Sequence, residues 1–218
     1  TFTTELPSTG QTIKFRPFLV KEEKVLLLAL ESEDQKQITD AIVTLLTNCI
    51  QSRLKVRNLA MFDLEFLFLQ IRGKSVGEDL ELKLTCSDDN ETVVDVAINV
   101  DDVKVFKPEE ASDMVHITDD ITVKMKYPSL DQFIKNYFTL EQSQEQVFEL
   151  VANCIDQVIE GEEVHESTNY SKKEMQAFLD GLTSKQFENM QTFFANMPKL
   201  THTINVTNPN TGKESEYL

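Results

Sequence analysis

The segment from Phe62 to Glu78 most constrains the fold, because it joins the densest apolar run in the chain to a glycine-containing end. At about 100° per residue, a helix here has two apolar sides separated by narrow polar seams. One side holds Leu64, Leu67, Phe68 and Ile71, and the other holds Phe62, Phe66 and Leu69. Both sides must be covered, either by the domain itself or by a partner protein. We therefore predict a central core helix, with an assembly interface as the alternative.

The balance of charge excludes several classes of function. The 218 residues have a formal net charge of −16 and a pI of about 4.6. Such a chain repels free nucleic acid and anionic lipid. The acidic residues cluster: residues 84–103 contain six acids and no Lys or Arg, and residues 136–171 contain eight acids and no Lys or Arg. These stretches are interpreted as solvated faces, and the alternatives are docking onto a basic partner or mimicry of nucleic acid.

Hydropathy and cysteine content indicate a protein made in the cytosol. No run approaches the roughly 18 apolar residues of a membrane span, and no cationic segment precedes an apolar signal core. Three cysteines, Cys49, Cys86 and Cys154, do not form a disulfide framework. Cys49 lies on the apolar stripe of a predicted helix, so we expect a buried, unreactive thiol. A reducing compartment fits this pattern.

The first third of the chain has helical periodicity after a short strand that ends at Pro17. Helices are predicted over residues 17–31, 35–52 and 60–73, where apolar residues recur with helical spacing. Residues 25–30 are apolar without interruption, so the second half of the first helix is expected to be buried. Short links between the three helices predict a packed helical unit.

After Gly77 the apolar period changes from about four to two. Residues 80–86 and 93–98 alternate on either side of a polar turn, which predicts a β-hairpin. Residues 103–106 and 115–127 add short strands. We predict one small antiparallel sheet over residues 78–128.

Helical periodicity returns in the last third. Helices are predicted over residues 130–138, 144–159, 172–182 and 184–196, with an acidic, mobile loop at 161–169 and a terminal hairpin formed by residues 203–207 and 213–218. The fold class is therefore α+β. Its predicted regions are a helical unit at 1–77, the sheet at 78–128 and a helical region with a hairpin at 129–218.

No motif in the chain carries recognisable catalytic or cofactor chemistry. Gly73-Lys74-Ser75 resembles the end of a phosphate-binding loop, but Phe68 stands where that motif needs glycine. His116, His165 and His202 are scattered and form no ligand or triad pattern. We predict no catalytic residue, no cofactor and no enzyme activity.

Two turns have the shape of zinc knuckles but lack the ligands. Cys86–Asp89 would be a C-x-x-C with its second cysteine replaced, and Asn208–Thr211 would have both cysteines replaced. A structural zinc site needs four soft or imidazole ligands, so we predict no metal. The two turns are interpreted either as a zinc ribbon that has lost its ligands or as two ordinary turns with no metal history.

Two apolar groups are candidates for contact with a partner. The first is on the helix predicted over residues 60–73 and consists of Phe62, Phe66 and Leu69. The second is on the last helix and consists of Met190, Phe193, Phe194 and Met197. Core packing is the first interpretation of both groups, and a partner interface is the second.

Several strings of residues resemble the baseplate hub assembly family of T-even-type contractile-tailed phages. They are Leu6–Lys24, Ala29–Ser32, Phe62–Phe66, Arg72–Glu78 and Tyr127-Pro128. Members of that family often carry cysteine pairs at the two knuckle positions, and this chain departs from them there. The resemblance is dense over residues 5–78 and weak beyond about residue 130.

The resemblance implies a non-enzymatic phage protein that helps to build the central hub of the tail baseplate. Its expected partners are other hub and tail proteins, including the tape-measure protein, with no direct contact to nucleic acid. Its expected location is the host cytoplasm during assembly, and the finished tail if it stays there. An acidic inhibitor that binds a basic host protein is the alternative from another class.

Overall fold

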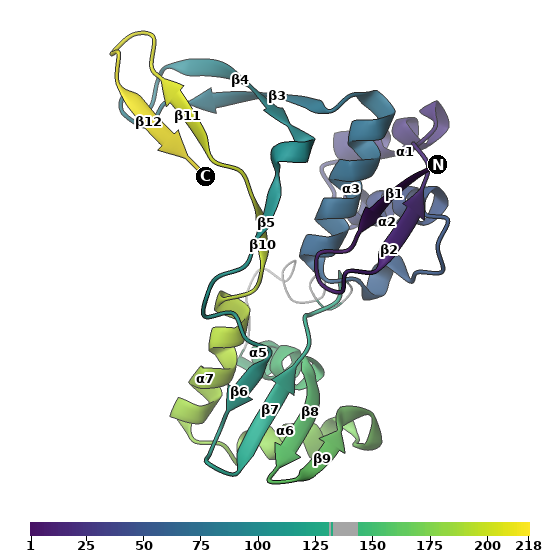
Figure 1. Ribbon diagram of the computed structural model, residues 1–218, viewed down its shortest axis with the longest axis vertical. Helices are drawn as coiled ribbons and strands as arrows, with labels where there is room; N and C mark the ends of the chain where they lie inside the picture. The colour runs from purple at the N-terminus through teal and green to yellow at the C-terminus, as the bar shows by residue number, and fades with distance from the viewer. Residues whose placement is uncertain (131, 133–143) are drawn as a thin grey trace. The chain divides into compact units, whose positions relative to one another are not determined.

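The computed structural model describes residues 1–130, 132 and 144–218 (Figure 1). The fold is α+β, as predicted, and the chain forms two compact units. Unit 1 consists of residues 1–56, 62–106 and 199–218; unit 2 consists of residues 57–61 and 107–198. These boundaries differ from the three predicted consecutive regions, because the end of the chain pairs with elements from its first half.

The helical part of unit 1 follows the sequence prediction closely. Strands β1 (Phe2–Glu5) and β2 (Thr12–Phe15) form an antiparallel hairpin. Helices α1 (Val20–Glu31), α2 (Gln35–Cys49) and α3 (Met61–Val76) follow, with the short helix η1 (Val56–Asn58) before α3. The Asp34 side chain caps α2 by accepting a hydrogen bond from the backbone N–H of Gln37 at 2.9 Å.

Helix α3 is a core helix, and it is longer than predicted. Leu67 and Ile71 are fully buried. The helix does not end at Gly73 but continues to Val76, and Gly77 follows it with a φ of +119°. Gly73 is needed for packing, because a Cβ atom there would lie 2.7 Å from Cγ2 of Val100. A methyl group therefore has no room at this point of the helix.

The remaining strands of unit 1 form three separate two-stranded ribbons. Strand β3 (Asp79–Thr85) pairs with β4 (Val93–Asn99), β5 (Lys104–Phe106) with β10 (Lys199–Thr201), and β11 (Ile204–Thr207) with β12 (Glu214–Tyr217). Helix η2 (Val100–Asp102) links β4 to β5. The predicted hairpins at 80–98 and 203–218 are confirmed. The prediction of one sheet over residues 78–128 is wrong, because β5 pairs with a strand from the end of the chain.

Unit 2 is built on a four-stranded antiparallel sheet in the order β6-β7-β8-β9. Its strands are β6 (Met114–His116), β7 (Ile121–Met125), β8 (Ile155–Glu160) and β9 (Glu163–Glu166). Helix α5 (Gln144–Asn153) ends six residues before the predicted helix does, and the predicted loop at 161–169 contains β9. Residues 151, 154, 155 and 158 are apolar with spacings that suit a helix, but pairing of β8 with β7 decides for a strand.

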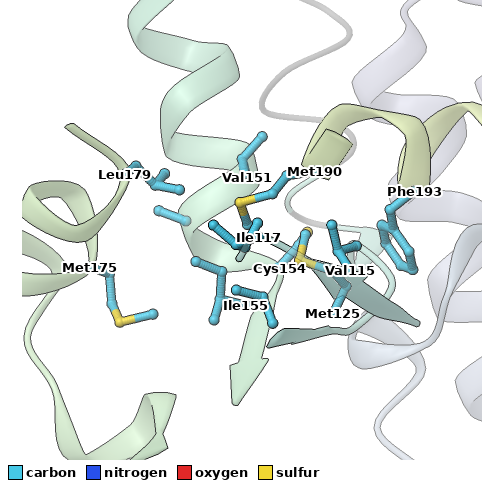
Figure 2. Packing of buried hydrophobic residues seen from close by; sticks show 12 residues of the cluster. Val115, Ile117, Met125, Val151, Cys154, Ile155, Met175, Leu179, Met190 and Phe193 are labelled. Atoms are coloured by element: carbon cyan, nitrogen blue, oxygen red, sulfur yellow. The ribbon is translucent and has the colours of Figure 1, made fainter. Parts of the chain in front are cut away.

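Helices α5, α6 (Lys172–Asp180) and α7 (Ser184–Ala195) pack onto this sheet, and helix η3 (Ser167–Asn169) precedes α6. Ser171 and Glu174 form a capping box at the start of α6, and Thr183 and Gln186 form one at the start of α7. Figure 2 shows the shared core, in which Val151, Cys154, Met175, Leu179, Met190 and Phe193 meet residues of the sheet. Most of the predicted helix at 130–138 lies outside the described residues.

Candidate functional site

Helix α1 exposes a large apolar surface, contrary to the expectation that residues 25–30 are buried. Only Leu26 and Ala29 of this segment are buried, while Leu28 is 56% exposed. Apolar side chains about half exposed or more lie at Leu19, Val20, Val25, Leu27, Leu28 and Leu30. Scattered exposed apolar residues are normal, but six of them on and next to one helix make α1 a candidate contact surface.

One narrow stripe anchors α1 to the rest of unit 1. Glu22, Leu26 and Ala29 are buried on this stripe. The Glu22 carboxylate accepts two hydrogen bonds from the Arg16 guanidinium, at 2.7 and 3.0 Å, and one from the backbone N–H of Leu19 at 2.7 Å. The bond from Arg16 lowers the pKa of Glu22 to about 2. The anchor is therefore electrostatic as well as apolar, and both flanks of the helix stay open.

The thiol of Cys49 lies beside this anchor and is unreactive, as expected. Cys49 is fully buried, and burial raises its pKa to about 11. Its side chain therefore fills space at the end of α2, below the stripe of α1.

On one flank, α1 and α2 enclose a shallow apolar groove. Val25 of α1 and Ala41 and Leu45 of α2 line one hollow, which has a volume of about 230 Å³. A second hollow shares Val25 and Ala41 and reaches Leu28. The exposed flank of α1 therefore continues into a depression that an apolar side chain can fill.

A second open apolar face lies on the β3–β4 ribbon. The register opposes Leu80 to Ile98, Leu82 to Val96 and Leu84 to Val94. Because alternate residues of a strand share a face, these six aliphatic side chains lie on the same side. Leu82 at the centre is 47% exposed, and the other five are half-buried. Beyond the two ends, Cys86 and Val100 are buried. The face is thus fixed at its ends and open in its middle.

The two knuckle-like turns meet and hold one end of this ribbon. The side-chain amide of Asn208, which is buried, donates to the carboxylates of Asp88 and Asp89 at 2.9 Å each. The Thr211 hydroxyl donates to Asp88 as well. The backbone N–H of Ser87 donates to the Tyr217 hydroxyl at 2.8 Å. Hydrogen bonds therefore join the two turns. We call this group, formed by residues 87–89 with Asn208, Thr211 and Tyr217, the turn clasp.

The carboxyl groups of Asp88 and Asp89 in the turn clasp are ionised at neutral pH, because the pKa of each is lowered. Hydrogen bonds from Asn208 and Thr211 lower the pKa of Asp88, and bonds from Thr92 lower that of Asp89. Burial raises the pKa of the Cys86 thiol. The open face of the ribbon thus ends at an acidic turn.

The predicted contact residues of α3 are divided by the structure. Phe62 is buried, whereas Phe66 and Leu69 are half-buried. The polar seam of this helix has a structural role, because the buried carboxylate of Asp63 accepts hydrogen bonds from the backbone N–H, at 3.0 Å, and the hydroxyl of Ser8. This contact ties α3 to the turn between β1 and β2.

The predicted contact residues of α7 belong to unit 2. Met190 is fully buried and Phe193 is 5% exposed, so both serve the core (Figure 2). Phe193 stacks on Tyr127 with ring centroids 5.4 Å apart. Phe194 and Met197 are half-buried and pack against the same core. Of these four residues, only Phe194 and Met197 keep part of their surface accessible.

The described residues contain no cluster of metal-ligand side chains. Within residues 1–130, 132 and 144–218, no three His, Cys, Asp or Glu side chains converge as metal ligands. His116 contacts the Thr122 hydroxyl, and His165 contacts the Tyr170 hydroxyl. Among the same residues, no helix has the length and apolarity of a membrane span.

Sequence reasoning missed both open faces, although each had a signal. Six consecutive apolar residues, 25–30, point in every direction around a helix, so one neighbouring helix cannot bury all of them. In the hairpin, both strands place their aliphatic residues on one face, and a two-stranded ribbon has no third strand to help cover it.

The comparisons with known proteins give one match. No curated protein and no solved structure matches the chain. The protein family described as T4 bacteriophage base plate protein matches it over residues 1–218, its whole length. The chain therefore belongs to the T4 bacteriophage base plate protein family, with a structural role in the baseplate of a phage tail.

Proposed function

We propose that this chain takes part in assembly of the baseplate central hub through protein–protein contacts, as a hub component or an assembly factor without catalytic activity. The family supports a baseplate role, and the open apolar face of the β3–β4 ribbon is the observation that carries the proposal. Assembly would take place in the host cytoplasm before the tail is complete.

The β3–β4 face is suited to a partner because it is rigid as well as apolar. The turn clasp holds one end, and the packing of Val100 against Gly73 of α3 holds the other. A preformed surface loses little conformational freedom on binding. Burial of the exposed part of Leu82 and its neighbours would supply favourable free energy, at about 25 cal/mol per Å² of apolar area.

The charge around the face selects the chemistry of the partner. Residues 84–103, which include β4 and both of its ends, carry six acids and no Lys or Arg. An apolar segment flanked by Lys or Arg complements this arrangement, and an acidic segment is repelled. We assign the face to such a segment from another hub or tail protein. The tape-measure protein is a candidate.

The half-buried residues of the two predicted contact groups supply additional contacts in this proposal. They are Phe66 and Leu69 on α3, Phe194 on α7, and Met197 just after α7. Met190 and Phe193 would act indirectly, by holding α7 in place.

The test is retention of hub, tail and tape-measure proteins co-expressed with this chain. Leu82→Gln places an uncharged polar group on the open face, and Ala97→Gln places the same group on the opposite face of the ribbon. We expect wild type and Ala97→Gln to retain a partner and Leu82→Gln to lose most of it. Retention of no partner by the wild-type chain would refute the proposal.

The same assay separates hub assembly from an acidic inhibitor of a basic host protein. An inhibitor held by charge alone would release its partner steeply with salt and would tolerate Leu82→Gln. Hub assembly through the apolar face instead predicts that the partner stays bound as the salt concentration rises and that Leu82→Gln releases it.

A further inference from the structure

The outer face of α1 has a charge order that complements itself. Lys24, Leu27, Leu28 and Glu31 follow one another at i, i+3, i+4 and i+7, so they share one stripe of the helix. All four side chains are exposed, as is Val20 on the turn before them. From the N-terminal to the C-terminal end of the helix, the stripe therefore has one basic, two apolar and one acidic side chain.

This order is symmetric about the point between Leu27 and Leu28. Lys24 and Glu31 lie at equal distances from it, and so do the two leucines. When two such stripes pack in antiparallel fashion across a twofold axis, four leucines form the central layer. Lys24 of each copy then faces Glu31 of the other. Parallel packing would instead place Lys24 beside Lys24 and Glu31 beside Glu31, which repel.

We propose that α1 joins two copies of this chain, as an antiparallel pair with Leu27 and Leu28 at its centre and two intermolecular Lys24–Glu31 ion pairs. A twofold interface uses the same patch on both copies, so the patch must be complementary to itself. The exposed stripe of α1 meets this requirement in both apolarity and charge.

The charged groups of Lys24 and Glu31 are both on exposed side chains. Among the described residues, Lys24 and Glu31 have no ion-pair partner, and their separation of seven positions corresponds to about 10.5 Å along the helix. They are therefore free to pair across an interface. The net charge of −16 per chain opposes dimerisation, but charges more than about 8 Å away are largely screened at physiological salt.

The size of the helix sets the expected affinity. Helix α1 has 12 residues, which is about 18 Å of length. A pair of such helices buries less than the roughly 1,200 Å² of a standard stable interface. The dimer is therefore expected to be reversible, with a Kd on the order of micromolar.

The test is sedimentation velocity over a concentration series with four variants of the full chain. Lys24→Glu or Glu31→Lys alone places like charges at both ion-pair positions, so each should raise the Kd at least about tenfold. The double variant Lys24→Glu/Glu31→Lys restores opposite charges and should return the Kd to within about threefold of wild type. Leu28→Gln removes apolar contact from the centre and should weaken the dimer about tenfold or more.

Mixing the two single variants provides a control for folding. One carries two acids on the stripe and the other two bases, so a mixture should form heterodimers more tightly than either variant alone forms a homodimer. Circular dichroism should give the same helix content for all the variants. A monomeric wild type at every concentration, a dimer indifferent to the single reversals, or a double variant that is not rescued would each overturn the proposal.

The outcome is independent of the hub proposal. A monomeric wild type whose α1 variants lose a co-expressed hub protein would assign α1 to that protein instead and overturn the dimer. Retention of hub proteins through the β3–β4 face is tested by Leu82→Gln, which leaves α1 unchanged.

Discussion

Helices α7 and α1 both carry many apolar side chains, but those of α7 are mostly buried and those of α1 are mostly exposed. In α7, Met190 is fully buried and Phe193 nearly so. In α1, Leu27 and Leu28 are more than half exposed. The sequence pattern makes α7 a candidate interface and predicts that residues 25–30 are buried. In the structure, the side chains of residues 25–30 are the more exposed of the two groups.

The difference lies in how the apolar residues are arranged around each helix. The apolar positions of α7, which include 187, 190, 193 and 194, keep to one side, and one sheet with its helices covers that side. The apolar positions of α1 extend around most of the helix, while one stripe packs inside the unit. Apolar residues beyond the width of one stripe are therefore a better sign of an interface than apolar content alone.

The largest expected effect tests the buried side of this comparison. Phe193→Ala should reduce the free energy of unfolding of unit 2 by about 3–5 kcal/mol, because it leaves a cavity beneath α7 and removes the stack on Tyr127. Urea unfolding, together with hydrogen exchange of the amides of α7, measures the loss. A loss below about 1 kcal/mol would mean that α7 is not a core helix.

The next effect concerns the clasp that holds the β3–β4 ribbon. Asn208→Ala should cost about 1–3 kcal/mol, because a buried amide that serves two carboxylates is removed. Asn210→Ala is the matched control, since Asn210 is exposed and makes one side-chain bond, to Thr92. Equal losses in the two variants, measured by urea unfolding, would contradict a specific role for Asn208.

A smaller effect tests how α1 is anchored. Glu22→Gln should cost about 1–2 kcal/mol at neutral pH, because the charge-assisted bonds from Arg16 are lost. The folded-state pKa of Glu22, about 2, lies below its ordinary value of 4.5. Its contribution is therefore complete above about pH 4.5 and disappears as the pH falls toward 2.

The measurement is the difference in unfolding free energy between wild type and Glu22→Gln from pH 6 to pH 2. That difference should shrink steadily below about pH 4.5. A difference that stays constant over this range would show that the bond to Arg16 does not stabilise the charged carboxylate.

The smallest effect tests the exposed side of the comparison. Leu28→Gln should change the stability of the monomer by no more than about 0.5 kcal/mol, because the side chain is already 56% exposed. Thermal unfolding at a concentration below the expected dimer Kd measures this change. A large loss would show that Leu28 supports the fold of unit 1.

The elements that could be predicted from the sequence are those with an unambiguous period. Strict alternation over residues 80–86 and 93–98 specified the hairpin, and residues 35–49 have only one apolar stripe, which specified a helix. The apolar spacing of residues 151, 154, 155 and 158 suits a helix, and only the pairing with β7 makes residues 155–160 the strand β8.

The contact surfaces depended on features that periodicity does not contain. The knuckle-like turns were recognised in sequence as two separate turns, and only the fold brings Asn208 within 2.9 Å of Asp88. Likewise, the sequence shows that residues 25–30 are apolar, but not which of them α2 covers.

By itself the sequence determined the α+β class, the acidic charge, the order of most helices and hairpins, and the resemblance to phage baseplate proteins. These properties follow from composition and from patterns between near neighbours, which are local. Tertiary structure decided the strand partners, the two discontinuous units and the exposure of α1. These properties depend on contacts between separate elements, some of them far apart in the sequence, as in the hydrogen bond between Ser87 and Tyr217, and no local pattern specifies them.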